Sequence, residues 1–312
     1  MSTKRVIDLR QLDYYVRVAE LGSFTKAAGA LSVAQSALSR QVSLLERQFG
    51  TRLLHRTGRG VLVTEEGQRA LHAMKSLLAE AEHLAADLKA SRGELSGTVN
   101  LGVLAGLSPA LLTPLLYRVH DRFPGVRMSV REGLTHHVEE WLADGTVELG
   151  IIYHSRAMQR ATDQPLLRTE LHLMGAPGDR LTRRKSVRLA ELAHLPMLLP
   201  AVPNRHRTLL EKIFEEHQVA LDVVIELDSI ITMKDLAASG RGHTILPLHA
   251  AYREIAAGHL QAARIMGPSI SRTVLLTSTT QRPMSRACRE VERLILEVVA
   301  GLVASGQLPA RR

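Results

Sequence analysis

The chain has 312 residues, of which 45% are hydrophobic, with one cysteine and a formal net charge of +9. This length predicts two or three folded units, and a single cysteine cannot form an intrachain disulfide, so a reducing, cytoplasmic setting is expected. The N-terminus has no apolar core of signal-peptide length, and no apolar run approaches the roughly 18 residues of a membrane span, so neither export nor membrane insertion is expected.

The positive charge is concentrated near the N-terminus. Residues 1–60 contain ten Lys or Arg against four Asp or Glu, whereas residues 61–94 contain four against six. A basic segment attracts the phosphates of nucleic acids. Many soluble proteins are basic, so this charge becomes informative only where it coincides with a motif.

Three helices are predicted in this basic segment, over residues 8–21, 25–31 and 34–49. Only Ser32 and Val33 separate the second helix from the third. Two helices joined by so tight a turn predict a helix-turn-helix, whose second helix can enter a major groove. The predicted inward-facing residues of the first and third helices are Leu9, Leu12, Tyr15, Val16, Ala19, Ala37, Leu38, Val42, Leu45 and Phe49.

The opposite side of the third helix is polar. Arg and Gln can make paired hydrogen bonds to base edges, and Ser can bond to bases or phosphates. The alternative is a solvated face on an ordinary helical bundle. Ser23 is a predicted N-cap of the second helix. The candidate DNA-contacting residues are Ser23, Thr25, Gln35, Ser36, Ser39, Arg40 and Ser43.

Two short strands, at residues 53–56 and 60–63, are predicted to follow Gly50 and to form a wing. Arg56 and Arg59 are candidates for contacts with the DNA backbone or the minor groove. Two solvent-facing arginines on a turn are the alternative interpretation.

A long helix is predicted from Thr64 onward. Its apolar residues alternate in spacings of four and three, which is typical of a coiled-coil seam. The seam predicts pairing with a second copy, although burial within its own subunit is the alternative. The seam consists of Ala70, Met74, Leu77, Ala81, Leu84 and Leu88.

Beyond residue 97 strands alternate with helices, which predicts parallel α/β layers. Strands are expected near residues 98–103, 126–131, 147–153, 166–176, 195–200, 223–227, 242–248 and 270–279, and helices near 109–123, 138–142, 208–217, 230–238 and 285–304.

The N-terminal pattern resembles the DNA-binding domain of LysR-type transcriptional regulators. The run from Ala238 to Pro247 is similar to a signature of that family, and residues 226–232 resemble its nitrogen assimilation control branch. The residues that carry the N-terminal resemblance are Phe24, Ala27, Ala28, Ala34, Gln35, Ala37, Leu38, Ser39, Leu45, Glu46, Leu53 and Arg56.

This resemblance implies an α/β chain with a winged helix-turn-helix at 1–64, a linker and dimerisation helix at 65–94, and an effector domain at 95–312. The effector domain would resemble type II periplasmic binding proteins. Its subdomain I would span about 95–160 and 269–312 and its subdomain II about 161–268, with crossings near 155–165 and 266–270. The family also suggests a tetramer and RNA polymerase as a partner.

An effector cleft is expected between the two subdomains, at strand ends and helix N-termini. Residues 106–108 are expected to offer free backbone amides to an anion. Arg205 and His206 favour a ligand that bears a carboxylate, against the alternative of a solvated basic loop. The candidate effector-binding residues are Gly106, Leu107, Ser108, Thr135, Tyr153, His154, Pro200, Arg205, His206, Ser229 and Ile230.

Two positions depart from the family pattern, which often has a hydroxyl at Gly106 and a proline at Ser36. No metal site or cofactor is expected, since His136 and His137 lack partners at ligand spacing and no nucleophile elbow or phosphate-binding loop is present. No catalytic residue is predicted.

The sequence thus predicts a dimeric, ligand-responsive transcription regulator that binds double-stranded DNA at two related half-sites. The alternative from another class is a cytosolic solute-binding module with a helical assembly arm and no sequence-specific DNA binding. A catalytic α/β protein is a more distant third.

Overall fold

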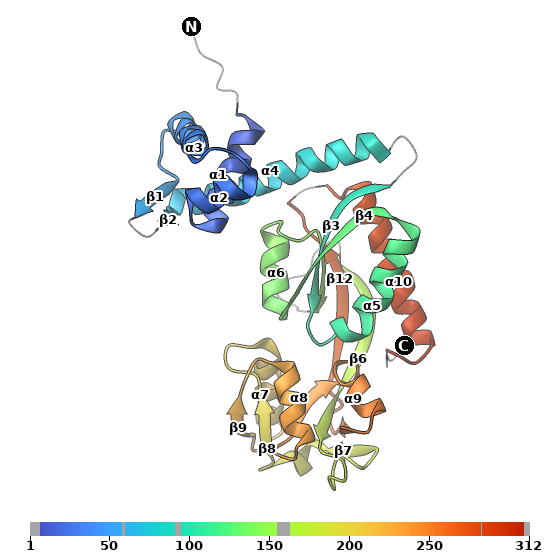
Figure 1. Cartoon of the computed structure of the whole chain (residues 1–312). Helices are drawn as coiled ribbons and strands as arrows, with labels where there is room; N and C mark the ends of the chain where they lie inside the picture. The colour runs from blue at the N-terminus through green and yellow to red at the C-terminus, as the bar shows by residue number, and fades with distance from the viewer. Residues whose placement is uncertain (1–6, 58–59, 91–94, 155–162, 282, 309–312) are drawn as a thin grey trace.

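The computed structural model describes residues 7–57, 60–90, 95–154, 163–281 and 283–308. A small helical domain with a two-stranded wing is joined by one long helix to an α/β region built from two stacked lobes (Figure 1). The predicted fold class is confirmed.

The N-terminal domain has three helices and a hairpin. Asp8 caps the first helix, Gly22 ends it in the left-handed conformation, and Ser23 caps the second, as its position in the sequence predicted. Glu46 Oε1 accepts hydrogen bonds from the amides of Leu53 and Leu54, which turns the chain into the wing. The elements are α1 (Leu9–Leu21), α2 (Phe24–Leu31), α3 (Gln35–Phe49), β1 (Leu54–Thr57) and β2 (Gly60–Val63).

Leu12, Tyr15 and Leu38 lie at the centre of this domain and are almost completely buried. Three residues predicted to face inward do not. Leu9 is 46% exposed in the first turn of α1 and Phe49 is 41% exposed in the last turn of α3, because no other element covers these helix ends. Ala37 is exposed beside Ser36 and Arg40 on the outer side of α3.

The long helix α4 (Glu65–Ala90) begins where Thr64 Oγ1 accepts a hydrogen bond from the Gly67 amide. The predicted seam divides into two parts. Met74 is buried against the helical domain of its own chain, so the pairing interpretation is wrong for this part. Leu77 and Leu84 are 52% and 61% exposed within the single chain. The side chain of Leu88 and residues 91–94 lie outside the described part.

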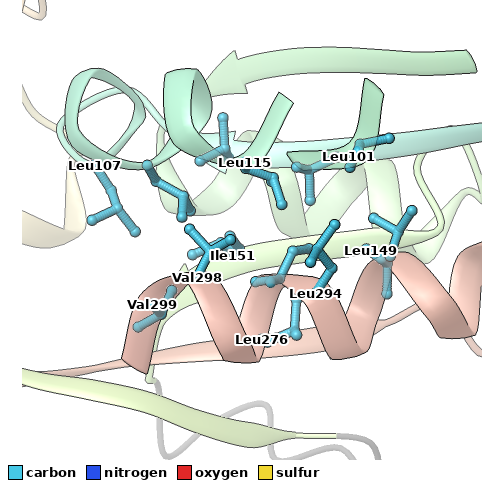
Figure 2. Close-up of a cluster of buried hydrophobic side chains, with 14 of the residues drawn as sticks. Leu101, Leu107, Leu115, Leu149, Ile151, Leu276, Leu294, Val298 and Val299 are labelled. Carbon is cyan, nitrogen blue, oxygen red and sulfur yellow. The ribbon is translucent and has the colours of Figure 1, made fainter. Parts of the chain in front are cut away.

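In the first lobe, helices cover both faces of a sheet, on which alternate residues of a strand face opposite sides. Leu149 and Ile151 of β5 pack toward α5 and α10 (Figure 2). Ile152 packs on the opposite face, toward α6. The elements are β3 (Ser96–Leu104), α5 (Ser108–Arg122), β4 (Gly125–Gly133), α6 (Thr135–Ala143), β5 (Leu149–Tyr153), β12 (Ser271–Ser278) and α10 (Arg286–Ala304).

The second lobe is built on the far half of a long strand, β6, which pairs with β12 at its start and with β10 and β11 at its end. β6 and β12 therefore run from one lobe into the other (Figure 1). The elements of this lobe are β6 (Gln164–Gly175), β7 (Ser186–Arg188), β8 (Pro196–Leu199), α7 (Arg205–Glu216), β9 (Asp222–Glu226), α8 (Ile230–Ala238), β10 (Thr244–Pro247), α9 (Tyr252–Ala256) and β11 (Gln261–Met266), with short 3-10 turns at Leu189–Leu192 and Leu248–Ala250.

The expectation of parallel layers was only partly correct. Within the described residues the main sheet has the order β4-β3-β5-β12-β6-β11-β7. β3 is parallel to β4 and β5, but β12 and β6 are antiparallel to their neighbours because the chain crosses between the lobes twice in opposite directions. β7, β11 and α9 were not predicted, since they are short and have no strong periodicity.

Candidate functional sites

The polar face of α3 is open to solvent. Gln35, Ser36 and Arg40 are exposed, and Ser39 and Ser43 are partly buried on the same side. The Thr25 hydroxyl of α2 donates to Gln35 Oε1 at 3.3 Å, which ties the first turn of α3 to the preceding helix. Ser23 accepts a hydrogen bond from the Lys26 amide as the N-cap of α2, so its hydroxyl has a structural partner.

Arg56 links the wing to this face. Its Nη2 donates to Ser39 Oγ at 2.7 Å, and its guanidinium lies 4.7 Å from the centre of the Phe24 ring. Arg56 therefore holds α2, α3 and β1 in one arrangement while remaining exposed. Arg59 lies outside the described residues.

A cavity of about 70 Å³ lies between the two lobes. Seven of the residues predicted to bind an effector line it, and they come from both lobes. They are Gly106, Thr135, Tyr153, Pro200, Arg205, His206 and Ile230. His154 lines an adjoining outer hollow that shares Tyr153 and Arg205 with the cavity.

Three predicted effector residues line neither the cavity nor the outer hollow. Leu107 is fully buried in the first lobe, and its amide donates to the carbonyl of Leu104, so the expectation of a free amide there was wrong. The Ser108 hydroxyl donates to Glu132 at 2.6 Å. Ser229 serves as the N-cap of α8, where its hydroxyl accepts from the Thr232 amide.

The two basic residues that favoured a carboxylate ligand are engaged in other ways. Arg205 forms an ion pair with Glu139 of the first lobe, with 2.7 Å between Nη1 and Oε1. His206 Nε2 lies 2.7 Å from the carbonyl oxygen of Ile245. Burial, reinforced by the charge of Arg272, lowers the pKa of His206 to about 4, so this ring is neutral at pH 7.

The sequence did not single out Arg272, which lines the cavity, or His249, which contacts the lining residue Tyr153. The Arg272 guanidinium stacks 3.7 Å from the centre of the Tyr153 ring, and the Tyr153 hydroxyl lies 3.2 Å from His249 Nε2. Burial, followed by the charge of Arg272, lowers the pKa of His249 to about 3. The only sequence signal was an Arg inside a predicted strand, and its closeness to Tyr153 is set by the tertiary fold.

Other lining residues make the cavity largely apolar. Gly106 brings the two lobes close together, since a Cβ placed there would lie 3.4 Å from that of Ala250 and 3.6 Å from Ile230 Cδ1. The further lining residues, also missed from the sequence, are Leu104, Ala105, Gly133, Leu134, His136, Asn204, Asp228, Met233, Leu246 and Pro247.

In the part of the chain that the structure describes, no three His, Cys, Asp or Glu residues form a group suited to a metal ion. The described helices include none with the length and apolarity required to cross a membrane.

A winged helix-turn-helix joined through a long helix to a two-lobed α/β region defines a DNA-binding regulator with an effector-binding domain. Residues 9–68 match the family described as "Bacterial regulatory helix-turn-helix protein, lysR family", and residues 92–300 match "LysR substrate binding domain". The chain belongs to the LysR family of transcriptional regulators.

Similar proteins extend over almost the whole chain. The nitrogen assimilation regulatory protein nac of Klebsiella aerogenes is 30% identical over 298 residues, covering 94% of this chain and 96% of the relative. The transcriptional regulator CfxR of Cupriavidus necator is 29% identical, covering 100% of this chain and 99% of the relative. These relatives support a transcription regulator over a solute-binding module.

Solved structures agree on the fold. A full-length OxyR variant from Pseudomonas aeruginosa has a TM-score of 0.74 at 22% identity, covering 94% of this chain and 95% of that one. Full-length CbnR, solved in complex with its target DNA, has a TM-score of 0.68 at 20% identity, covering 95% and 99%.

Proposed function

We propose that this regulator acts as a homodimer that places two copies of α3 in the major groove at two related half-sites. The exposed polar face of α3 carries this proposal, because Gln35, Ser36 and Arg40 point away from the core of their own domain. Ser39 and Arg56 would act as a pair, since the hydrogen bond between them fixes where each can meet DNA. Ser43, Thr25 and Ser23 would contact the backbone nearby, and Arg59 would extend the wing.

The exposed leucines of α4 support a dimer through the linker helix. Leu77 and Leu84 are seven residues apart and therefore lie on the same side of the helix. The protein would have the three units given above, at 1–64, 65–94 and 95–312. A tetramer, contact with RNA polymerase, a cytoplasmic location and the absence of catalytic activity complete the proposal by analogy with the family.

The cavity between the lobes would bind a small-molecule effector. Residues of both lobes line it, so a ligand there favours one angle between them. A change in that angle would alter the packing of effector domains in the oligomer and hence the spacing of the recognition helices. This supports regulation by population shift.

Footprinting on the DNA upstream of its own gene, over a range of salt concentrations, tests this function. We expect two protected half-sites. Arg40→Ala should weaken specific binding by about 10- to 100-fold, the effect of losing one base or phosphate contact, and Ser39→Ala should weaken it less. Arg127→Ala, an exposed residue of β4, removes the same charge far from α3 and serves as the control.

Binding that depends on salt but not on sequence would refute the proposal. It would favour the solute-binding module, in which the basic N-terminal domain has only an assembly role.

A further inference from the structure

The cavity between the lobes contains two arginines whose surroundings differ. Arg205 has its carboxylate partner, Glu139, whose side chain is 5% exposed. Arg272 contacts the Tyr153 ring and lies 3.4 Å from His206 Nδ1, but it has no Asp or Glu partner among the described residues. Residues 155–162, which lie outside the described part, contain no Asp or Glu.

The neighbouring histidines do not offset this charge. Both His206 and His249 have lowered pKa values and are neutral at pH 7, so neither adds a second cation nor supplies an anion. His206 accepts from Arg272 through Nδ1, which leaves Nε2–H to donate to Ile245. A partly buried guanidinium without a counter-ion destabilises the protein unless a ligand supplies the charge.

The position of Arg272 determines where such a ligand can lie. Arg272, Tyr153 and Arg205 line both the inner cavity of about 70 Å³ and the outer hollow of about 320 Å³. Arg272 therefore stands at the boundary between the two. Inward of this boundary, Ile230, Met233 and Leu246 supply mostly apolar surface.

We propose that Arg272 is the anion anchor of the effector cavity and that the effector is a compact monocarboxylate with a short apolar body. The guanidinium can hold the carboxylate through two parallel hydrogen bonds, and stacking on Tyr153 fixes the plane of the guanidinium. The body occupies the inner cavity, which has room for roughly five water-sized groups at about 10–15 Å³ each. This inference rests on the proposed effector function and replaces Arg205 and His206 as the carboxylate-binding residues.

Titration calorimetry on the full-length protein tests the anchor. The probes are isobutyrate, isovalerate and 2-oxoisovalerate, each paired with its neutral amide, and benzoate as a ligand with a larger body. We expect at least one of the three short acids to bind, its amide to bind about 10- to 100-fold more weakly, and benzoate to bind more weakly than the best short acid.

Variants of Arg272 separate the effect of its positive charge from that of the planar guanidinium. Arg272→Met should weaken binding of the acid by about 10- to 100-fold. Arg272→Lys keeps the charge but not the planar guanidinium, so its affinity for the acid should lie between those of the native protein and Arg272→Met. Arg127→Met on β4 is the matched control and should leave affinity unchanged. Equal binding of acid and amide, unchanged affinity in Arg272→Met, or no binding by any of the three short acids would overturn the proposal.

A second measurement needs no ligand. If Arg272 is retained for binding, Arg272→Met removes an unpaired charge, and the melting temperature of the ligand-free protein should rise by about 2 °C or more. A fall would assign Arg272 a structural role and overturn the anchor. The footprint on DNA reports the proposed regulator function separately, so the anchor can fail while that function stands.

Discussion

Arg205 of α7 and Glu139 of α6 form an ion pair of 2.7 Å that joins the two lobes across the cavity. Other polar contacts also connect the lobes. Tyr153 meets His249 on one side, and Tyr252 and Arg253 both donate to the carbonyl of Pro109 on another. Polar contacts between the lobes therefore flank a largely apolar cavity.

The two halves of this ion pair should respond differently to mutation. Arg205→Ala leaves the buried Glu139 carboxylate without a partner and should destabilise the protein by about 1–3 kcal/mol. Glu139→Gln should cost less, because Arg205 is 40% exposed and can turn toward water. Denaturant unfolding of both variants and of the double variant checks this. The double variant should be more stable than Arg205→Ala alone, and the opposite order would contradict the argument.

Hydrogen exchange offers a second readout of the same pair. Both variants should exchange faster at the amides of α6 and α7 if the pair holds the lobes together. Arg184→Ala breaks an exposed pair with Glu191 that lies entirely within the second lobe, and it should leave exchange at the cavity unchanged.

The buried histidines predict a loss of stability in acid. The pKa of His249 is about 3 in the folded protein and near 6.5 in the unfolded chain. Above pH 6.5 both states are neutral there and His249 has no effect. As the pH falls below 6.5 only the unfolded chain gains the proton, so stability decreases until the pH approaches 3. The total loss from His249 is on the order of 3–5 kcal/mol.

Melting temperatures measured between pH 8 and pH 5 test this dependence. The melting temperature of His249→Gln should fall less with decreasing pH than that of the native protein. His120→Gln, at an exposed position of α5, should leave this pH dependence unchanged. An unchanged slope in His249→Gln would show that other groups dominate.

Gly67 should not tolerate a side chain. A Cβ there would lie 2.2 Å from the Leu53 carbonyl oxygen and 2.7 Å from the Tyr15 hydroxyl, which itself donates to the Gly67 carbonyl. Gly67→Ala should therefore destabilise the N-terminal domain by about 1–3 kcal/mol, as overpacking does. Gly29→Ala, in α2 with no atom within 4 Å, should stabilise the helix by up to about 1 kcal/mol. Thermal unfolding distinguishes the two, and similar effects would contradict the packing argument.

The exposed leucines of α4 should control assembly. Leu77→Asp and Leu84→Asp place charges on a surface that would pair with a second copy. The dimer of each variant should therefore dissociate at a higher protein concentration than the native dimer does. Light scattering after size-exclusion chromatography measures this. Leu62→Asp makes the same substitution in the wing, at a residue that is 61% exposed, and should leave the mass unchanged. If both α4 variants keep the mass of the native protein, Leu77 and Leu84 do not form the interface.

The sequence predicted the elements that local signals define. The short turn between α2 and α3 and the cap at Ser23 act within a few residues, so each could be interpreted without knowing the fold. The exposed polar face of α3, which is proposed to contact DNA, followed from helical periodicity. Family membership followed because the N-terminal pattern is long.

Tertiary structure decided which of these residues meet. Arg272 and Tyr153 are 119 positions apart, and only the return of the chain along β12 beside β5 brings them into contact. The same fold pairs Arg205 with Glu139, withdraws Leu107 from the cavity, and buries Met74 in its own subunit. Local spacing specifies which side of a helix or strand a residue occupies, whereas its partner there depends on contacts between distant segments, which no local pattern records.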